Sequence, residues 1–266
     1  MSGGVDSSVA LSLLLDEGYE CIGVTMKLWE NKDPISSVVR NSNCNTVEAI
    51  NGAKMVCDRL GVHHYTLDFM DIFKKNVVDD FSKEYLTGRT PNPCVRCNSI
   101  VKWKTLLQQA DIFGIDYIAT GHYARVQHNK DASYLLKGAD VLKDQSYMLW
   151  QINPAALKRT LLPLGKMTKS ETRDYAKARG LETAQTPESM DLCFVSGDDY
   201  SKFLNETMPE KMNSVTSGNI MDETGKVVGE HAGFTNYTIG QRKGVGVAFP
   251  EPRYVKKINP MDNSIV

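Results

Sequence analysis

A glycine- and serine-rich run stands at the start of the chain, over residues 2–8 (SGGVDSS). A helix is predicted to follow it directly, over residues 7–17. The glycines permit a tight turn that points successive amides into one concavity, and the helix N-terminus adds partial positive charge. Ser7 and Ser8 offer hydroxyls, and Asp6 can orient a metal ion or the loop itself. The run favours a phosphate site. It is not a Walker A loop, since it lacks the lysine, and an N-capped surface loop is the alternative interpretation.

The cysteines offer a second kind of chemistry, and their contexts differ. Cys94 and Cys97 follow two X-Pro breaks in a predicted irregular segment just before a helix, a setting that exposes a thiol and favours its thiolate. Their C-x-x-C spacing permits a disulfide, shared metal ligation or a reactive pair. Cys193 lies far downstream in a predicted loop. Cys21 and Cys57 sit in apolar or helical surroundings and are predicted to be inert.

Helices and strands alternate through most of the chain, and these elements must position the loop and the thiols. The predicted helices are 7–17, 47–60, 71–86 and 99–113, and the predicted strands are 21–28, 62–69 and 115–120. Strands separated by helices indicate βαβ units and a parallel sheet. The predicted fold class is therefore α/β, a parallel sheet with helices on both faces, spanning about residues 1–195.

The pattern changes after residue 120, where a hairpin is predicted over residues 123–138. Thr168 and Glu171 match a capping box that starts a further helix. From residue 214 onward the chain is rich in glycine and β-like, which predicts a separate small domain. Both ends look abrupt, because no strand leads into the first loop and the last predicted strand starts shortly before the chain stops. We interpret the sequence as a fragment.

The composition is that of an ordinary globular chain: 266 residues, 41% hydrophobic, 24% charged, with a net charge of −1. A histone-like nucleic-acid binder is excluded, whereas a locally basic face is not. Residues 157–181 form such a stretch, which either follows a polyanion or is a solvated helix face. No apolar run is long enough for a membrane span and no secretory leader is visible, so we predict a cytoplasmic protein with reduced thiols.

The SGGVDSS run resembles the signature of the PP-loop ATP pyrophosphatases, which split ATP between its α- and β-phosphates. Further blocks in a fixed order resemble the tRNA-specific 2-thiouridylase family of that superfamily. These blocks are residues 88–93, 97–98, 120–125, 143–147, 193–195 and 237–244. The resemblance covers nearly the whole chain. It implies an adenine nucleotide alpha hydrolase-like domain over 1–195, a small β-rich central domain over 196–248 and the start of a C-terminal β-barrel over 249–266.

The resemblance implies an ATP-dependent sulfurtransferase that puts sulfur on the wobble uridine of tRNA. ATP adenylates the uridine 2-oxygen, and a persulfide on Cys193 then supplies sulfur while Cys97 completes the transfer. The terminal sulfur attacks directly or leaves first as hydrosulfide, and a Cys97–Cys193 disulfide forms that must be reduced. The implied partners are tRNA, ATP with Mg²⁺, and a persulfide donor from a cysteine desulfurase relay.

Other positions receive roles from the same residue-by-residue match. The implied nucleotide-binding positions are Met1, Ser2, Gly3, Gly4, Val5, Asp6, Ser7, Ser8, Met26 and Gly121. The implied tRNA-binding positions are Asn92, Pro93, Cys94, His122, Lys143, Asp144 and Gln145. A purely structural role for His122 is an open alternative, and no residue is assigned as a dedicated metal ligand.

One position departs from the commonest pattern of the family. Many members have aspartate where this chain has Cys94, so a carboxylate is lost and a thiol is gained. An iron–sulfur cluster on Cys94, Cys97 and Cys193 is then an alternative to the persulfide route, which we favour. Two other functions stay open: a PP-loop ligase that adenylates a carboxylate, which needs no thiols, and a non-catalytic tRNA-binding remnant.

Overall fold

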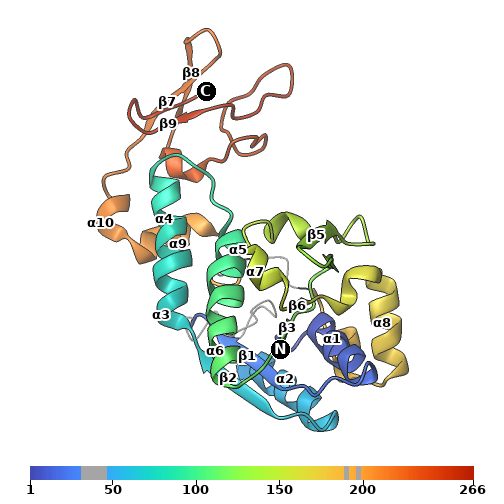
Figure 1. Ribbon diagram of the computed structural model, residues 1–266. Helices are drawn as coiled ribbons and strands as arrows, with labels where there is room; N and C mark the ends of the chain where they lie inside the picture. The colour runs from blue at the N-terminus through green and yellow to red at the C-terminus, as the bar shows by residue number, and fades with distance from the viewer. Residues whose placement is uncertain (31–46, 189–191, 196–198) are drawn as a thin grey trace. The chain divides into compact units, whose positions relative to one another are not determined.

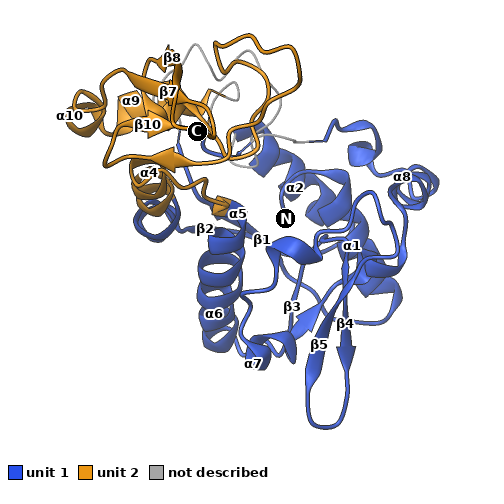
Figure 2. Ribbon diagram, turned by 90° about the horizontal axis from the view of Figure 1, so that it is seen from above, with its two compact units in different colours: residues 1–77, 94–194 blue, residues 78–93, 195–266 orange. Residues whose placement is uncertain are grey.

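The computed structural model describes residues 1–30, 47–188, 192–195 and 199–266. These residues group into two compact units, distinguished by colour in Figure 2. The first unit consists of residues 1–77 and 94–194, and the second of residues 78–93 and 195–266. The second unit is therefore built from two separate segments of the chain. The predicted domain limits at 195 and 248 remain predictions.

Parallel strand pairs form the centre of the first unit, in agreement with the predicted α/β class. The pairs are β1 (Gly23–Lys27) with β2 (His64–Asp68), and β3 (Ile118–Ala119) with β6 (Thr160–Leu161). They are two separate two-stranded sheets rather than one continuous sheet. β3 is shorter than the predicted strand over 115–120, because the amide of Ile115 still bonds to the Ala110 carbonyl of the preceding helix at 2.8 Å.

Helix α1 (Val5–Asp16) follows the first loop and is buried on most sides. It begins before residue 7, where the sequence predicts its start, because Gly4 already takes the extended N-cap conformation (φ −96°, ψ 167°). A left-handed Gly18 (φ +85°) follows its end. α1 packs against α8 (Lys169–Ala178), which lies beside it in Figure 1.

A long helical segment over residues 93–112 replaces the helix predicted over 99–113. It consists of α5 (Pro93–Arg96), a π-helical stretch (Cys97–Thr105) and α6 (Leu106–Ile112). It begins early because the fixed φ and missing amide proton of proline suit the first turn of a helix. Cys94 and Cys97 therefore lie within the helix, and the prediction that they occupy an irregular segment is wrong.

The other elements of the first unit surround this centre. They are α2 (Val47–Arg59), α3 (Met70–Phe73), a π-helical stretch (Lys74–Val78) that runs on into the second unit, β4 (Ala124–His128), β5 (Ser133–Lys137) and α7 (Pro154–Leu157). β4 and β5 form the predicted hairpin, with Ala124 opposite Lys137, and it projects from the unit in Figure 2.

The capping box predicted at the start of α8 is confirmed. The Thr168 amide donates to Glu171 Oε2 at 2.7 Å, and the Glu171 amide donates to Thr168 Oγ1 at 3.2 Å.

A hydrophobic cluster of side chains from α1, α8 and neighbouring segments packs next to the first loop. Its buried members are Val5, Val9, Ala10, Tyr123, Leu164, Ala176, Leu181 and Ala184. Because the loop ends at the first turn of α1, this core fixes the position of the loop relative to α8.

The second unit combines three helices with a small sheet. Its elements are α4 (Asp79–Leu86), α9 (Tyr200–Thr207), α10 (Pro209–Met212), β7 (Gly218–Met221), β8 (Val227–His231), β9 (Ile258–Asn259) and β10 (Ser264–Ile265). The four-stranded sheet has the order β8–β7–β10–β9. Phe81 of α4 packs edge-on against Phe203 of α9, with 6.2 Å between ring centres, and Tyr85 stacks on Tyr200 at 4.7 Å. Within the described ranges, no helix is both long and apolar enough to cross a membrane.

Candidate nucleotide and sulfur-transfer site

The first loop turns at Gly3, whose φ is +76°. A Cβ at this position would lie 2.5 Å from the carbonyl oxygen of Ala49 in α2, closer than any side chain tolerates. Gly3 is therefore required by its backbone conformation and by its neighbour. The turn delivers the chain to the start of α1, where the first helical amides lack intrahelical partners. This is the local geometry of an anion site.

The serines of the loop bond to the loop's own backbone. The Ser7 and Ser8 hydroxyls donate to the Gly4 carbonyl at 3.1 and 2.9 Å. The Ser2 amide donates to Ser7 Oγ at 3.2 Å, and the Gly4 amide to Ser2 Oγ at 3.4 Å. Binding a phosphate here therefore exchanges internal hydrogen bonds for bonds to the ligand.

Asp6 joins the loop to α8. The Lys169 ammonium lies 2.7 and 2.8 Å from the two Asp6 carboxylate oxygens, and only 12% of the Lys169 side chain is exposed. The Tyr123 hydroxyl donates to Asp6 Oδ1 at 2.8 Å, and the Lys169 ammonium lies 5.5 Å from the Tyr123 ring centre. Burial raises the pKa of Tyr123 well above its usual range, so this hydroxyl stays protonated. Asp6 thus holds the loop in place.

Lys169 is also one of three cations around the Glu188 carboxylate. The Lys143 ammonium lies 2.7 Å from Glu188 Oε2, and the Lys169 ammonium lies 3.7 Å from Oε1. Arg173 approaches Oε1 at 3.8 Å. The hydrogen bond from Lys143, helped by the charge of Lys169, lowers the pKa of Glu188. A cation cluster therefore adjoins the first loop through Lys169.

Gly121 and His122 lie next to the loop but in different environments. A Cβ on Gly121 would lie 2.7 Å from the Asp6 carbonyl carbon, so the close neighbour that needs this glycine is the loop backbone. His122 is 9% exposed, and its Nδ1 lies 2.8 Å from the Thr120 hydroxyl. The His122 ring packs against Trp103 at 5.6 Å. This burial favours the structural role that the sequence left open for His122.

The remaining predicted nucleotide positions lie around the first loop. The Val5 side chain is 4% exposed and belongs to the core, so only its backbone can contact a ligand. The Met1 amino group donates to the Val24 carbonyl, and the Thr25 hydroxyl donates to the Met1 carbonyl at 2.9 Å. Met26 lies half-buried on β1, one residue beyond Thr25. β1 therefore holds the loop entry and Met26 in one place.

The candidate sulfur residues belong to the first unit. Cys97 is 7% exposed at the start of the π-helical stretch, whereas Cys94 and Cys193 are half-buried. Phe194, next to Cys193, packs edge-on against Phe73 of α3 at 5.7 Å, and α3 packs against the stretch that begins at Cys97. Phe194 and the stretch that begins at Cys97 therefore share α3 as a neighbour. Burial raises the pKa of both Cys21 and Cys57, as expected for unreactive thiols.

The predicted tRNA-contacting turn is fixed by internal bonds. Lys143 pairs with Glu188. Asp144 accepts from the Gly138 and Ser146 amides at 2.8 and 3.2 Å, and Gln145 Oε1 accepts from the Tyr123 amide at 3.0 Å. Among the other tRNA positions, Asn92 is exposed and Pro93 is buried. Asp144 and Gln145 therefore shape the turn, whatever else they contact.

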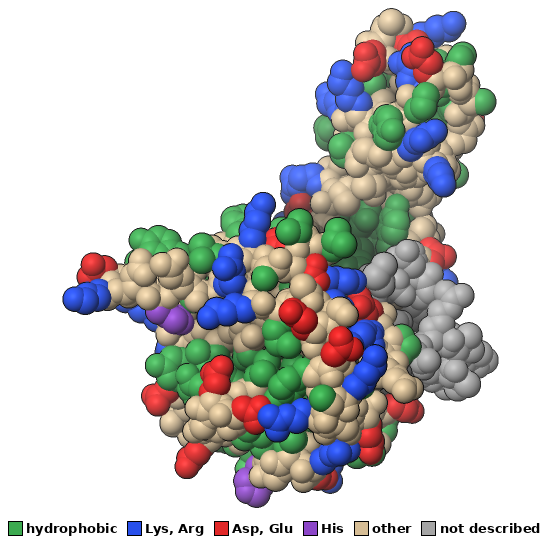
Figure 3. Space-filling model, turned by 90° about the vertical axis from the view of Figure 1, so that its right-hand side faces the viewer, with side chains coloured by type: hydrophobic (Ala, Val, Ile, Leu, Met, Phe, Trp, Pro, Cys, Tyr) green, Lys and Arg blue, Asp and Glu red, His purple; other side chains and the backbone are tan. Residues whose placement is uncertain are grey.

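The basic stretch over 157–181 is less available than its composition suggests. Arg159 donates to Asp111 and Arg179 to Asp16, while Arg173 donates to the carbonyls of Ala184 and Thr186. Lys158, Lys166 and Lys177 are the exposed lysines of the stretch. Basic and acidic side chains alternate over the face of the molecule shown in Figure 3. Much of the stretch holds the fold together.

The sequence did not single out Lys169, Glu188 or Tyr123. Lys169 counted as one cation of the basic stretch, and no local motif marks Glu188. Their roles depend on the packing of α8 against α1, which pairs positions far apart in the chain. The only local signal was the capping box, which fixes Lys169 as the first residue of α8.

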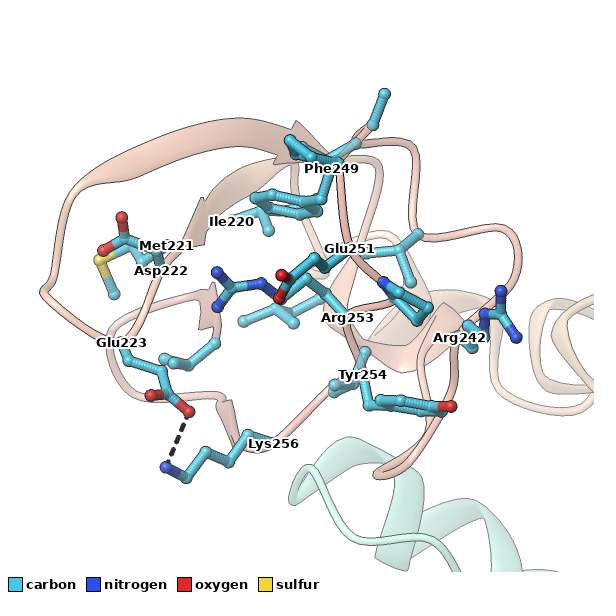
Figure 4. Close-up of a pocket in the computed structure, with 18 residues that line it drawn as sticks. Ile220, Met221, Asp222, Glu223, Arg242, Phe249, Glu251, Arg253, Tyr254 and Lys256 are labelled. Atoms are coloured by element: carbon cyan, nitrogen blue, oxygen red, sulfur yellow. Dashed lines mark hydrogen bonds and ion pairs between the residues drawn. The ribbon is translucent and has the colours of Figure 1, made fainter.

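A cavity of about 700 Å³ lies in the second unit (Figure 4). Its wall includes Phe249, Arg253 and Tyr254, with the Arg253 guanidinium 5.5 Å from the Phe249 ring centre. A Lys256–Glu223 ion pair of 3.0 Å closes one side. No residue predicted to bind nucleotide or to carry sulfur lines this cavity.

A glycine-bearing loop at the head of α1, next to parallel strand pairs, defines an α/β nucleotide-binding protein. Residues 1–197 match the family model of the tRNA methyl transferase HUP domain, and residues 201–266 match that of the tRNA methyl transferase PRC-barrel domain. The chain is 47% identical over 270 residues to the tRNA-specific 2-thiouridylase MnmA of Carboxydothermus hydrogenoformans, a match that covers 100% of this chain and 72% of the relative. The chain therefore belongs to the tRNA-specific 2-thiouridylase family.

A further curated relative agrees with this assignment. The MnmA of Acetivibrio thermocellus is 44% identical over 268 residues, covering 100% of this chain and 74% of the relative. Among solved structures, the U34-tRNA thiolase NcsA from Methanococcus maripaludis with its [4Fe-4S] cluster is similar, with 19% identity and a TM-score of 0.40. That match covers 80% of this chain and 66% of the thiolase chain.

Proposed function

We propose that this chain catalyses ATP-dependent 2-thiolation of the wobble uridine of tRNA. The observation that carries the proposal is the Gly3 turn at the head of α1, in a chain 47% identical to a tRNA-specific 2-thiouridylase. ATP binds at the loop over residues 1–8, with Met26 and Gly121 beside it. Its α-phosphate is transferred as AMP to the uridine 2-oxygen, and pyrophosphate leaves.

Sulfur replaces the activated oxygen in the second half of the reaction. The terminal sulfur of a Cys193 persulfide attacks uridine C2, and AMP leaves with the oxygen. The Cys97 thiolate then attacks Cys193 Sγ, so the S–S bond breaks and its electron pair stays on the sulfur now bound to C2. Release of hydrosulfide by Cys97 before the attack gives the same products. Either route leaves a Cys97–Cys193 disulfide, which a dithiol reductant reopens with two electrons.

Magnesium suits this site only after Lys169 moves. Mg²⁺ in nucleotide sites takes most of its ligands from phosphate and water, with one or two protein carboxylates. Asp6 is the carboxylate of the loop, and both its oxygens accept from Lys169. Asp6 would hold the magnesium ion in place of Lys169, and the ion would supply charge neutralisation for the phosphates.

The cysteines as arranged do not fit an iron–sulfur cluster. In the described ranges, no three or more His, Cys, Asp or Glu side chains stand as a group that could hold a metal ion. Cys94, Cys97 and Cys193 all lie within those ranges. The proposed chemistry therefore uses thiols and a persulfide supplied by a cysteine desulfurase relay.

Reconstituted thiolation tests the proposal. The purified chain is incubated with unmodified tRNA, ATP, Mg²⁺ and a persulfide donor, and 2-thiouridine is measured by nucleoside mass spectrometry. We expect Cys97→Ser and Cys193→Ser to abolish the product. Cys21→Ser serves as the matched control, because Cys21 is a half-buried thiol outside the site, and it keeps the wild-type yield.

Two outcomes contradict the proposal. Full turnover by Cys97→Ser, with pyrophosphate still released, indicates a ligase that needs no thiols. Binding of tRNA without any pyrophosphate release from ATP indicates a non-catalytic tRNA-binding protein.

A further inference from the structure

Three cations converge on one carboxylate beside the first loop. Glu188 Oε2 is bound by Lys143 at 2.7 Å, and Oε1 lies 3.7 Å from Lys169 and 3.8 Å from Arg173. The Glu188 side chain is 29% exposed, and those of Lys143 and Arg173 are 38% and 27% exposed. Because Asp6 also pairs with Lys169, two carboxylates face three cations at this partly exposed site.

Asp140 fixes the backbone at both lysines, because its carboxylate bonds to their main-chain amides. One of its carboxylate oxygens accepts from the Lys143 amide at 3.2 Å, and the other accepts from the Lys169 amide at 2.9 Å. Arg173 is fixed in turn by the Ala184 carbonyl at 2.7 Å. The backbone at both lysines, the Lys169 ammonium on Asp6 and the Arg173 guanidinium are therefore held by partners other than Glu188.

The chemistry of the cluster matches a phosphate better than a carboxylate. A terminal phosphate offers three oxygens and up to two negative charges, whereas Glu188 offers two oxygens and one charge. Lysine and arginine are the side chains that proteins use most for phosphate. Lys169 also bonds to Asp6 within the loop, so a phosphate on the cluster lies next to a nucleotide held at the head of α1.

Glu188 can leave the cluster at low cost. Its residue lies outside any helix or strand, in the segment that follows the 3-10 turn over Glu182–Gln185. Its closest ion pair, with Lys143, is partly exposed, and its pairs with Lys169 and Arg173 are long, at 3.7 and 3.8 Å, so each contributes little stability.

We propose that Lys143, Lys169 and Arg173 form an oxyanion site for the diphosphate end of the nucleotide, and that Glu188 fills this site until the ligand displaces it. The inference rests on the proposed function and deepens it: the site takes the β- and γ-phosphates of ATP and holds the pyrophosphate that leaves. It supplies from distant segments the positive charge that the loop itself lacks.

Calorimetric titration of the full chain with inorganic pyrophosphate tests the site. We expect Glu188→Gln to bind pyrophosphate about three- to tenfold more tightly than wild type, since the competing carboxylate is gone. Lys143→Met should weaken binding about tenfold. Lys169→Met should also weaken pyrophosphate binding about tenfold. Lys169 also pairs with Asp6, and if loss of that pair unfolds this variant, Lys143→Met carries the test alone.

Matched controls separate the site from general charge effects. Glu182→Gln removes an exposed carboxylate six residues before Glu188, and Lys177→Met removes an exposed cation of α8. Both should leave pyrophosphate affinity unchanged. Equal tightening by Glu182→Gln and Glu188→Gln, or no tightening by Glu188→Gln, overturns the inference.

A second titration, with unmodified tRNA and no nucleotide, identifies the source of the phosphate. Glu188→Gln should leave tRNA affinity unchanged. Tighter tRNA binding with unchanged pyrophosphate affinity would assign the cluster to the RNA backbone and overturn the inference. The thiolation assay tests the proposed function separately from the oxyanion site. If wild type makes no 2-thiouridine while Glu188→Gln still tightens pyrophosphate binding, the proposed function is wrong and the oxyanion site is supported.

Discussion

His122 illustrates how burial decides the role of a single side chain. Burial, followed by the charge of Lys102, holds the pKa of His122 well below its usual range, so the ring is neutral in the folded protein. The unfolded chain binds a proton near pH 6.5, and the folded protein does not. Stability contributed by the neutral ring is therefore complete above that pH and falls as the pH drops toward the folded-state pKa.

His122→Asn should flatten the acid side of the stability curve. Wild type is expected to lose up to about 1 kcal/mol of unfolding free energy per pH unit from this residue below pH 6.5. Urea unfolding at several pH values between 7.5 and 5.0 measures the slope. His64 and His231 also have lowered pKa values, but they are present in both proteins, so the difference isolates His122.

The matched control is His128→Asn on the exposed hairpin, where the ring bonds to Ser133. This variant should keep the wild-type slope. If His122→Asn also keeps it, His122 is not the buried neutral group described above.

Individual residues were predictable where the chemistry is local. Gly3 could be assigned from the sequence, because a turn before a helix needs a residue with positive φ. The partners of Asp6 could not, because Lys169 and Tyr123 reach it only through tertiary packing. The ion pair between Lys143 and Glu188 could not be predicted either, because it also depends on tertiary packing.

Among the elements, α8 has the most direct influence on the site. Its first residue is Lys169, and the Thr168–Glu171 capping box fixes where the helix begins. Thr168→Ala should cost about 1 kcal/mol of unfolding free energy. It should also weaken pyrophosphate binding several-fold, since Lys169 is no longer held at a fixed helix start. Urea unfolding and calorimetric titration of the same protein measure the two effects.

Asn153→Ala provides the comparison, because Asn153 caps α7 by accepting from the Ala155 amide at 2.8 Å. This variant should lose similar stability and keep its affinity for pyrophosphate. Parallel loss of affinity in both variants would mean that stability, not helix position, controls the site.

Elements with regular periodicity and clear caps were predicted to within a few residues, as for α1 and α8. The helix over 93–112 was misplaced because Pro93 fits both a break and a helix start, and only packing decides between them. β3 was predicted too long because apolar residues after a helix do not reveal how far the helix bonds continue.

At the scale of the whole molecule, we propose that contacts of exposed lysines with RNA phosphates contribute to tRNA binding. Affinity should fall with rising salt, because each RNA phosphate contact releases counterions. The triple variant that replaces the exposed lysines of the basic stretch by alanine should reduce the slope of log affinity against log salt by about two. The replaced residues are Lys158, Lys166 and Lys177. Filter binding at several salt concentrations measures the slope.

A second triple variant changes the net charge equally at exposed positions outside the stretch. Its replaced residues are Lys130, Lys202 and Lys211. It should keep the wild-type slope. Equal slopes for the two variants would show that the stretch has no special role in RNA binding.

The two-segment construction of the second unit limits how this protein can be dissected. A piece starting at residue 201 would keep Phe203 but lack Phe81, because that ring comes from α4, more than a hundred positions earlier in the chain. Cleavage near residue 198 would separate the C-terminal segment covalently from α4, so only packing such as that of Phe203 on Phe81 would hold the two pieces together. Chimeras between relatives must therefore exchange residues 78–93 together with the C-terminal segment. Otherwise the transplanted segment loses the native packing of its aromatic rings against those of α4.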